Sequence, residues 1–252
     1  MKKYNIPVRS FLFFLLCLLV VLSVYSCSKK GSMEVAVNPL PVIPDTAIVP
    51  PPAAGKPFLA LGDSYTIGQS VQEAARFPNQ TAQILTSSQV AISKPDIIAT
   101  TGWTTANLLN ALNINPPHHN YTIVTLLIGV NNQYQHKSLD EYKIEFTRLL
   151  DSAITYAGNI KSHVFVLSIP DYSVTPFAQG SDMAAIAREI DEFNAANKKI
   201  SDDYHVQYLD ITAISREALS NPDLNATDGL HPSGSQYRRW AELLADMIKK
   251  SL

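Results

Sequence analysis

The stretch Leu59-Ala60-Leu61-Gly62-Asp63-Ser64-Tyr65-Thr66 decides the fold. The apolar run at residues 58–61 follows a proline-rich segment and predicts a buried strand that begins a domain. We expect Gly62 to end this strand and to allow a close approach of backbone. Asp63 and Ser64 then stand where the chain should turn into a helix. Open α/β sheets bind ligands at such a strand-to-helix turn, although a turn or N-cap role would also explain the serine.

Strand-like and helix-like segments alternate along the rest of the chain. Pro95 interrupts one expected strand and predicts an edge or irregular strand there, whereas residues 122–128 are apolar on both faces and predict a central one. Ser138 with Glu141, and Ser233 with Gln236, are capping boxes that predict helix starts. The expected strands are residues 58–61, 90–99, 122–128, 163–169 and 206–211, and the expected helices are residues 78–86, 104–112, 139–156, 186–200 and 234–248. This order predicts an α/β fold, a parallel sheet with helices on both faces.

The first 26 residues have the pattern of a signal peptide. Basic residues precede an unbroken apolar run at 11–22, which is too short for a bilayer span of about 20 residues. Val24-Tyr25-Ser26-Cys27 resembles the lipoprotein box of bacteria, in which the cysteine is lipidated. Tyr25 is unusual there, so cleavage without lipidation and an uncleaved anchor remain alternatives. The expected location is the bacterial cell envelope, with a lipid anchor at Cys27.

Residues 27–57 contain seven of the sixteen prolines and predict an extended tether, leaving residues 58–252 as the folded domain.

Removal of residues 1–26 would take away three cations and no acid, which changes the formal net charge from −2 to −5. A mildly acidic chain without a basic cluster is a poor nucleic-acid binder. Cys17 and Cys27 are the two cysteines, and neither lies in the expected domain. A disulfide or a cysteine-based zinc site is therefore excluded there.

Polar residues stand in five loops that we expect at one edge of the sheet, because each follows a strand or precedes the last helix. The candidate residues, in chain order, are Ser64, Gly102, Asn131, residues 170–177, Asp228 and His231. Single features have simpler explanations: Asn131 would suit a local turn, and Asp228-Gly229 would suit another. Trp103, Tyr134, His136, Tyr172 and Phe177 fit either a pocket wall or ordinary loop packing.

Together the candidate residues have the chemistry of nucleophilic catalysis. A serine hydroxyl is a weak nucleophile and needs an adjacent base, which His231 would supply for Ser64. Asp228, three residues earlier, would hold the imidazole tautomer and stabilise the imidazolium. The backbone N–H groups of Ser64 and Gly102 and the Asn131 amide would form an oxyanion hole.

These four blocks, Gly62-Asp63-Ser64, Gly102, Gly129-Val130-Asn131 and Asp228-Gly229-Leu230-His231-Pro232, resemble those of the GDSL/SGNH hydrolase family in order and spacing. The resemblance implies a three-layer αβα sandwich with a flavodoxin-like parallel sheet. It implies ester hydrolysis through Ser64, His231 and Asp228, the same oxyanion donors, and no metal or organic cofactor.

The sequence departs from the family pattern at two positions. Tyr65 replaces a leucine, a change that we expect to affect no catalytic atom, and Asn132 replaces an aspartate that would help to fix the loop of Asn131. The expected substrates are O-acylated carbohydrates, lysophospholipids or other short acyl esters. The alternatives are a catalytically weak surface binding lipoprotein, and a thioesterase or acyltransferase that uses the same triad.

Overall fold

The computed structural model describes residues 55–117 and 120–252. The expected signal peptide, most of the tether, Cys17 and Cys27 lie outside the described residues. The expectations for those segments therefore stay predictions.

Five parallel strands form one sheet in the order β2-β1-β3-β4-β5. Their bounds are Phe58–Gly62 (β1), Asp96–Ala99 (β2), Ile123–Leu127 (β3), Val164–Leu167 (β4) and Gln207–Leu209 (β5). This is the flavodoxin-like order, in which the chain reverses its direction of travel across the sheet between β1 and β3. The predicted fold class is confirmed, with β3 central and β2 at an edge.

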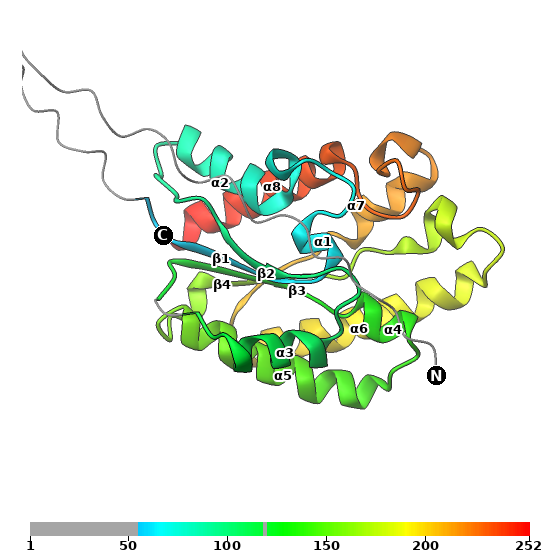
Figure 1. Ribbon diagram of the computed structural model, residues 1–252, viewed down its shortest axis with the longest axis horizontal. Coiled ribbons are helices and arrows are strands. Elements are labelled where there is room, and N and C mark those ends of the chain that lie inside the picture. The colour runs from blue at the N-terminus through cyan, green and yellow to red at the C-terminus, as the bar shows by residue number, and fades with distance from the viewer. Residues whose placement is uncertain (1–54, 118–119) are drawn as a thin grey trace, which may run out of the picture. The chain divides into compact units, whose positions relative to one another are not determined.

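Helices cover both faces of this sheet (Figure 1). The long helices α2 (Phe77–Ser87) and α8 (Gly234–Ser251) lie on one face, and α3 (Thr105–Ile114), α5 (Leu139–Tyr156) and α6 (Met183–Tyr204) lie on the other. Three short helices follow strands: α1 (Ser64–Ile67), α4 (Val130–Tyr134) and α7 (Thr212–Arg216). Short 3-10 turns occupy Glu73–Ala75, Lys161–His163, Tyr172–Val174, Pro176–Ala178, Glu217–Leu219 and Pro222–Leu224.

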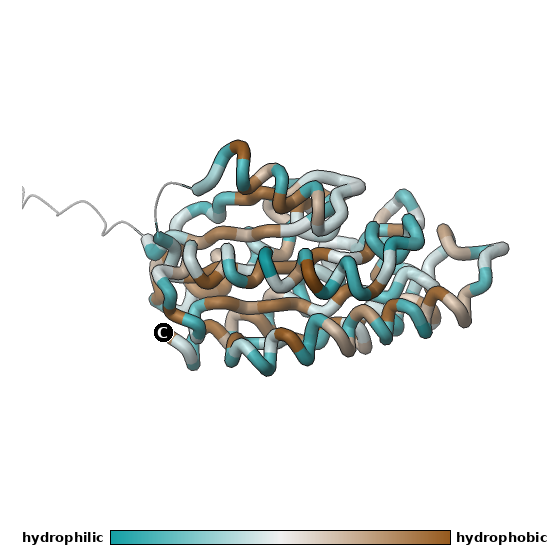
Figure 2. The backbone as a smooth tube through the Cα atoms, turned by 90° about the horizontal axis from the view of Figure 1, so that it is seen from below, coloured by the Kyte–Doolittle hydropathy of each residue, from teal (hydrophilic) through white to brown (hydrophobic). Residues whose placement is uncertain are grey.

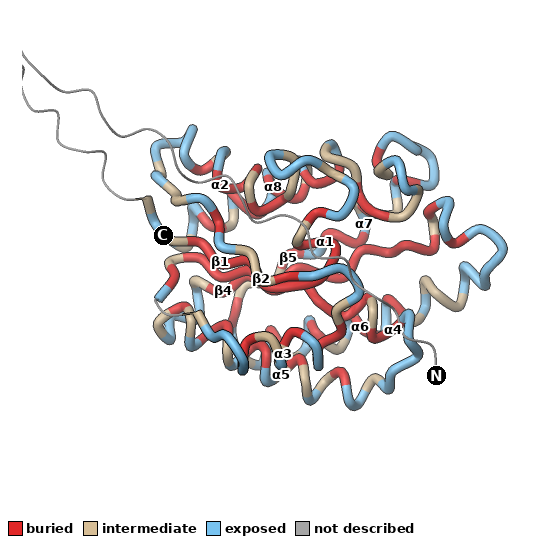
Figure 3. The backbone as a smooth tube through the Cα atoms, in the orientation of Figure 1, coloured by how far each residue is buried: buried red, intermediate tan, exposed pale blue. Residues whose placement is uncertain are grey.

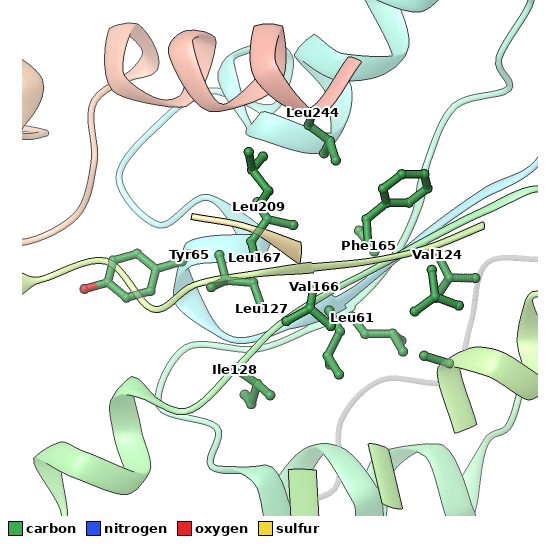
Figure 4. Packing of buried hydrophobic residues seen from close by; sticks show 14 of the residues in the cluster. Leu61, Tyr65, Val124, Leu127, Ile128, Phe165, Val166, Leu167, Leu209 and Leu244 are labelled. Carbon is green, nitrogen blue, oxygen red and sulfur yellow. The ribbon is translucent and has the colours of Figure 1, made fainter. Parts of the chain in front are cut away.

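Apolar residues on both faces of the strands explain why two helical layers are needed. Every residue of β1, β3 and β4 is buried, and the strands form the apolar, buried centre of the molecule (Figures 2 and 3). Phe165 and Leu209 point toward Leu244 of α8, whereas Val166 and Leu61 point to the opposite layer (Figure 4). Burial of each such side chain stabilises the fold by about 1.5–3 kcal/mol. Successive side chains of β4 therefore pack against the helices on opposite faces of the sheet.

Local signals in the sequence set the helix starts. Ser138 Oγ accepts a hydrogen bond from the Glu141 backbone N–H at 3.0 Å, and Ser233 Oγ accepts one from Gln236 N–H at 3.3 Å. Both predicted starts are thereby confirmed. A reciprocal capping box that the sequence analysis did not single out joins Thr104 to Asn107 at the start of α3.

The predictions for Gly62 are confirmed. It ends the first strand as the last paired residue of β1, opposite Ala99 and Leu127, and it lies close to neighbouring backbone. A Cβ atom at Gly62 would collide with the Leu127 carbonyl oxygen and with Thr66. Glycine is needed here because the neighbouring strand and the first turn of α1 leave no room for a side chain.

Candidate active site

The turn from β1 into α1 presents Ser64 at the carboxyl end of the sheet. Asp63 is the N-cap of α1, and its Oδ1 accepts a hydrogen bond from the Tyr65 backbone N–H at 3.0 Å. Ser64 is the first helical residue and is 4% exposed. The cap fixes the direction in which the chain leaves the strand, and thereby the position of the serine.

Asp63 is an acid in an apolar setting. Burial raises the pKa of its carboxyl group to about 7, against the opposing effect of the Tyr65 and Gly129 backbone N–H groups. Burial also raises the pKa of Tyr65 well above its ordinary value. Around neutral pH the carboxyl group therefore titrates, whereas the phenol stays protonated.

The loops after β2 and β3 lie beside this turn. Gly102 has φ +84° and Gly129 has φ +134°. Residues with a Cβ rarely adopt these backbone conformations. The Asn131 side-chain amide donates to the Trp103 carbonyl oxygen at 3.0 Å, which joins the two loops. Trp103 itself packs against the core and does not line the cavity described below, so packing explains it.

Asn132, the departure from the family pattern, is buried and holds the third loop in place. Its Oδ1 accepts from the Thr105 backbone N–H at 3.0 Å, and its Nδ2 donates to Thr105 Oγ1 at 2.6 Å. The Thr105 hydroxyl in turn donates to the Glu145 carboxylate. The amide thus makes a two-point contact with the start of α3 and leaves the Thr105 hydroxyl hydrogen free for Glu145. The loss of a negative charge at position 132 does not leave the loop unfixed.

The turn before α8 holds an Asp–His pair. Asp228 Oδ2 lies 2.7 Å from His231 Nδ1, and Asp228 Oδ1 accepts from the backbone N–H groups of Leu230 and His231, each at 3.0 Å. Partial burial works against ionisation, but hydrogen bonds from the Ser70 hydroxyl and from His231 hold the pKa of Asp228 well below its ordinary value. Because Asp228 is ionised and accepts only, the facing Nδ1 of His231 carries the hydrogen.

Four of the five predicted side chains and backbone donors meet in one cavity of about 160 Å³. Ser64, Gly102, Asn131 and His231 line it, and Asp228 stands behind the imidazole. The site lies at the carboxyl ends of β1 and β3, near α1 and α4 (Figure 1). The structure therefore brings together residues that are up to 167 positions apart in the sequence.

Aromatic side chains form part of the cavity wall. Tyr134, Tyr172 and Phe177 line it, with ring centroids 6.1–6.3 Å apart. Two contacts anchor this wall: Tyr172 Oη donates to Gln133 Oε1 at 3.0 Å, and the Phe177 N–H donates to the Gly229 carbonyl at 2.9 Å. The pocket interpretation thus holds for these three residues. His136, for which the sequence left a pocket wall and loop packing open, does not line the cavity.

The sequence analysis did not predict four further residues at the site. Ser70 contacts Asp228, and Gln69 accepts a hydrogen bond from Thr101 at 2.7 Å. Val130 and Leu230 line the cavity beside the predicted residues. Val130 and Leu230 are next to Asn131 and His231 in the sequence, and this adjacency could have identified them as cavity residues. Ser70 and Gln69 follow Gly68, whose left-handed conformation (φ +70°) turns the chain back toward the site.

No group of three or more His, Cys, Asp or Glu side chains among the described residues is placed to hold a metal ion. None of the helices in this part of the chain combines the length and the apolar character that a membrane span needs.

The chain matches a family of known proteins. The profile of the GDSL-like lipase/acylhydrolase family matches residues 60–239. No curated protein sequence matches the chain.

Solved structures share the fold at low sequence identity. Esterase EstA from Pseudoalteromonas sp. is 17% identical, with a TM-score of 0.57 over 77% of this chain and 97% of that one. Axe2, an acetylxylan esterase from Geobacillus stearothermophilus, is 18% identical, with a TM-score of 0.57 over 77% and 94%. TesA is 15% identical, with a TM-score of 0.58 over 78% and 100%.

The raised pKa of Asp63 predicts a pH dependence of stability. Between about pH 4 and pH 7 the native state keeps a proton on Asp63 that the unfolded chain releases. The stabilising effect is thus complete below pH 4, and the free energy of unfolding falls toward pH 7 by up to about 1.4 kcal/mol per pH unit from this group. Asp63→Asn stays neutral and keeps an oxygen for the Tyr65 N–H.

Urea unfolding of both proteins at four pH values between 4.5 and 7.5 measures this effect. Other titrating groups are common to the two proteins and cancel in the difference. Wild type should lose stability relative to Asp63→Asn as the pH rises. A difference that is independent of pH would show that the Asp63 pKa is not raised.

Proposed function

Because the chain belongs to the GDSL-like lipase/acylhydrolase family and is an ester hydrolase, we propose that Ser64, His231 and Asp228 form its catalytic triad. The observation that carries the proposal is the shared cavity: Ser64 and His231 line it, and Asp228 binds the imidazole from behind. The fold alone would not support the assignment, since one fold hosts many functions.

The first half of the reaction would form an acyl-enzyme. His231 Nε2 takes the Ser64 hydroxyl proton as the serine oxygen attacks the ester carbonyl carbon. The ionised Asp228 holds Nδ1–H and stabilises the imidazolium that results. His231 then gives the proton to the leaving alcohol oxygen as the ester C–O bond breaks. Water enters next, and the same residues release the acid.

The oxyanion would face fixed donors. The Ser64 and Gly102 backbone N–H groups and the Asn131 side-chain amide belong to residues that line the cavity. One amide hydrogen of Asn131 binds the Trp103 carbonyl, and this bond orients the other hydrogen for a substrate. Loss of one such donor costs about 10²–10³ in kcat.

The cavity supports esters of short acyl groups. An apolar cavity of about 150 Å³ holds a benzene-sized molecule, and this one measures about 160 Å³. Among the described Phe, Tyr and Trp residues, only Tyr134 (53%) and Phe177 (47%) are exposed, and both line this cavity. An open aromatic surface suits an amphipathic alcohol that stays partly hydrated, such as a sugar ring. We therefore favour an O-acylated carbohydrate over a lysophospholipid as the substrate.

The place of action follows from the N-terminal sequence. We propose that residues 1–26 direct export, that Cys27 is lipidated, and that residues 27–57 tether the domain at the bacterial cell envelope. The support is the basic start, the apolar run at residues 11–22 and the lipobox-like residues that end at Cys27.

Substitution of the nucleophile tests the triad. Ser64→Ala should lower kcat on p-nitrophenyl acetate by about 10⁴-fold or more, because no acyl-enzyme forms. Ser152→Ala, which removes a half-buried serine hydroxyl on α5 outside the cavity, is the matched control and should keep wild-type turnover. Undiminished turnover in Ser64→Ala would remove Ser64 from the mechanism.

The rival activities differ in their products and in their labelling. A fluorophosphonate should label wild type but not Ser64→Ala, whereas a pure binding protein would stay unlabelled. Product analysis with an added acceptor alcohol separates hydrolysis from acyl transfer.

Removal of the aromatic wall tests the substrate class. Tyr134→Ala and Phe177→Ala should each lower kcat/KM for an acetylated disaccharide by about tenfold, equivalent to roughly 1.4 kcal/mol of lost ring contact. Turnover of ethyl acetate should change less than twofold, because its leaving group has no ring. Leu243→Ala removes an exposed apolar side chain outside the cavity and is the control. Equal losses on both esters would contradict a role in recognising the alcohol.

Substitution of Cys27 tests the anchor. In a bacterial host, Cys27→Ser should move the protein from the membrane fraction to a soluble exported form, since a serine takes no thioether-linked lipid. Metabolic labelling with a fatty acid followed by fractionation measures the change. Unaltered membrane association together with unlabelled wild type would contradict lipidation.

A further inference from the structure

Ser70 joins the Asp228–His231 pair from a distant part of the chain. The Ser70 hydroxyl donates a hydrogen bond to Asp228 Oδ2 at 2.6 Å, across 158 positions of sequence. The same oxygen lies 2.7 Å from His231 Nδ1. The oxygen that orients the imidazole is therefore shared with a serine hydroxyl.

Ser70 supplies a hydrogen bond to Asp228 from outside the turn 228–231. Asp228 Oδ1 is held by the backbone N–H groups of Leu230 and His231, both within the turn 228–231. Of the hydrogen bonds recorded for this carboxylate in the described part of the chain, only that of Ser70 comes from outside the turn. It fixes Oδ2, the oxygen that faces the imidazole, against rotation of the carboxylate.

The backbone at Ser70 is unfavourable for a residue with a side chain. Ser70 has φ +65°, in the left-handed region where glycine is relaxed and other residues are strained. The preceding residue, Gln69, accepts a hydrogen bond from Thr101, next to Gly102 of the second loop. The turn 68–70 thus contacts both the Asp–His turn and the loop that would hold the oxyanion.

We propose that Ser70 is a positioning residue, whose hydroxyl holds the Asp228 carboxylate in the orientation that aligns His231 with Ser64. This inference rests on the proposed function. Ser70 keeps its own proton throughout and touches no reacting atom. It acts by limiting the motion of Asp228 and by sharing the negative charge of Oδ2 between two donors.

Other titratable groups face the same pair and must be common to the proteins compared. Tyr65 packs edge-on against the His231 ring with centroids 5.7 Å apart, and Tyr237 and Asp63 lie on the elements behind it. Burial raises the pKa of both tyrosines well above the ordinary value, so they stay neutral. Asp63 titrates near pH 7, but identically in all variants that keep it.

The test compares Ser70→Gly with Ser70→Asn in the full chain. Glycine removes the hydroxyl and relaxes the left-handed backbone, so a folding defect is not expected. Asparagine tolerates the left-handed region and restores an N–H donor. Gln89→Gly is the matched control, because Gln89 is an exposed residue with φ +66° outside the site.

Ser70→Gly should lower kcat on p-nitrophenyl acetate about three- to tenfold with KM within twofold, as expected for the loss of one hydrogen bond at an exposed position. The acid limb of its kcat/KM profile should move to higher pH by about half a unit, because the less neutralised carboxylate favours the imidazolium. Ser70→Asn should recover most of both effects, and Gln89→Gly should show neither.

A second readout does not depend on turnover. The Nδ1 proton of His231 should give a downfield NMR signal that shifts or broadens in Ser70→Gly and recovers in Ser70→Asn. Wild-type kcat, acid limb and NMR signal in Ser70→Gly would overturn the proposal. A lower kcat with an unmoved acid limb and a lower melting temperature would also overturn it, because that is the signature of a structural role. If wild type hydrolyses no ester, the proposed function fails, whereas the NMR comparison still decides the role of Ser70.

Discussion

The parallel pairing of β1 with β3 is the constraint on which the site depends. These strands are adjacent in the sheet although β2 lies between them in the sequence. Gly62 pairs with Leu127, so the turn that presents Ser64 starts level with the turn that presents Asn131. The missing side chain of Gly62 lets the two turns approach. Ser64 and Asn131, which come from separate segments, thereby line one cavity.

Hydrogen bonds then fix the loops that this pairing brings together. Asn131 binds the Trp103 carbonyl, Asn132 binds Thr105, and Phe177 N–H binds the Gly229 carbonyl. Each bond joins two loops rather than closing one. A site assembled from five loops gains rigidity in this way, and rigid donors cost no reorganisation when charge develops.

The position of a site residue could be predicted from the sequence where a polar residue directly follows an apolar run. Ser64 and Asn131 come directly after strands whose apolar character is unmistakable, and the capping serine at 233 marks the helix that follows His231. The carboxyl ends of parallel strands must share one edge, so their convergence could be predicted.

Contacts between side chains could not be predicted in the same way. Nothing near Ser70 in the sequence indicates that its hydroxyl meets Asp228, because the contact depends on the left-handed turn at residues 68–70. The substitution at Asn132 suggested a weakened loop, but its partner Thr105 lies 27 positions away and supplies both hydrogen bonds. The sequence predicted that Gly62 ends the strand and allows a close approach of backbone, but it did not indicate that the Leu127 carbonyl oxygen is the neighbouring group.

The most direct test of the central claim is a crystal structure of the protein after reaction with a fluorophosphonate. We predict phosphorus bonded to Ser64 Oγ, its oxygen about 2.7–3.1 Å from the Ser64 and Gly102 nitrogens and from Asn131 Nδ2, and His231 Nε2 within hydrogen-bond distance of Ser64 Oγ. An adduct on another residue, or a phosphonyl oxygen that points away from these donors, would contradict the account.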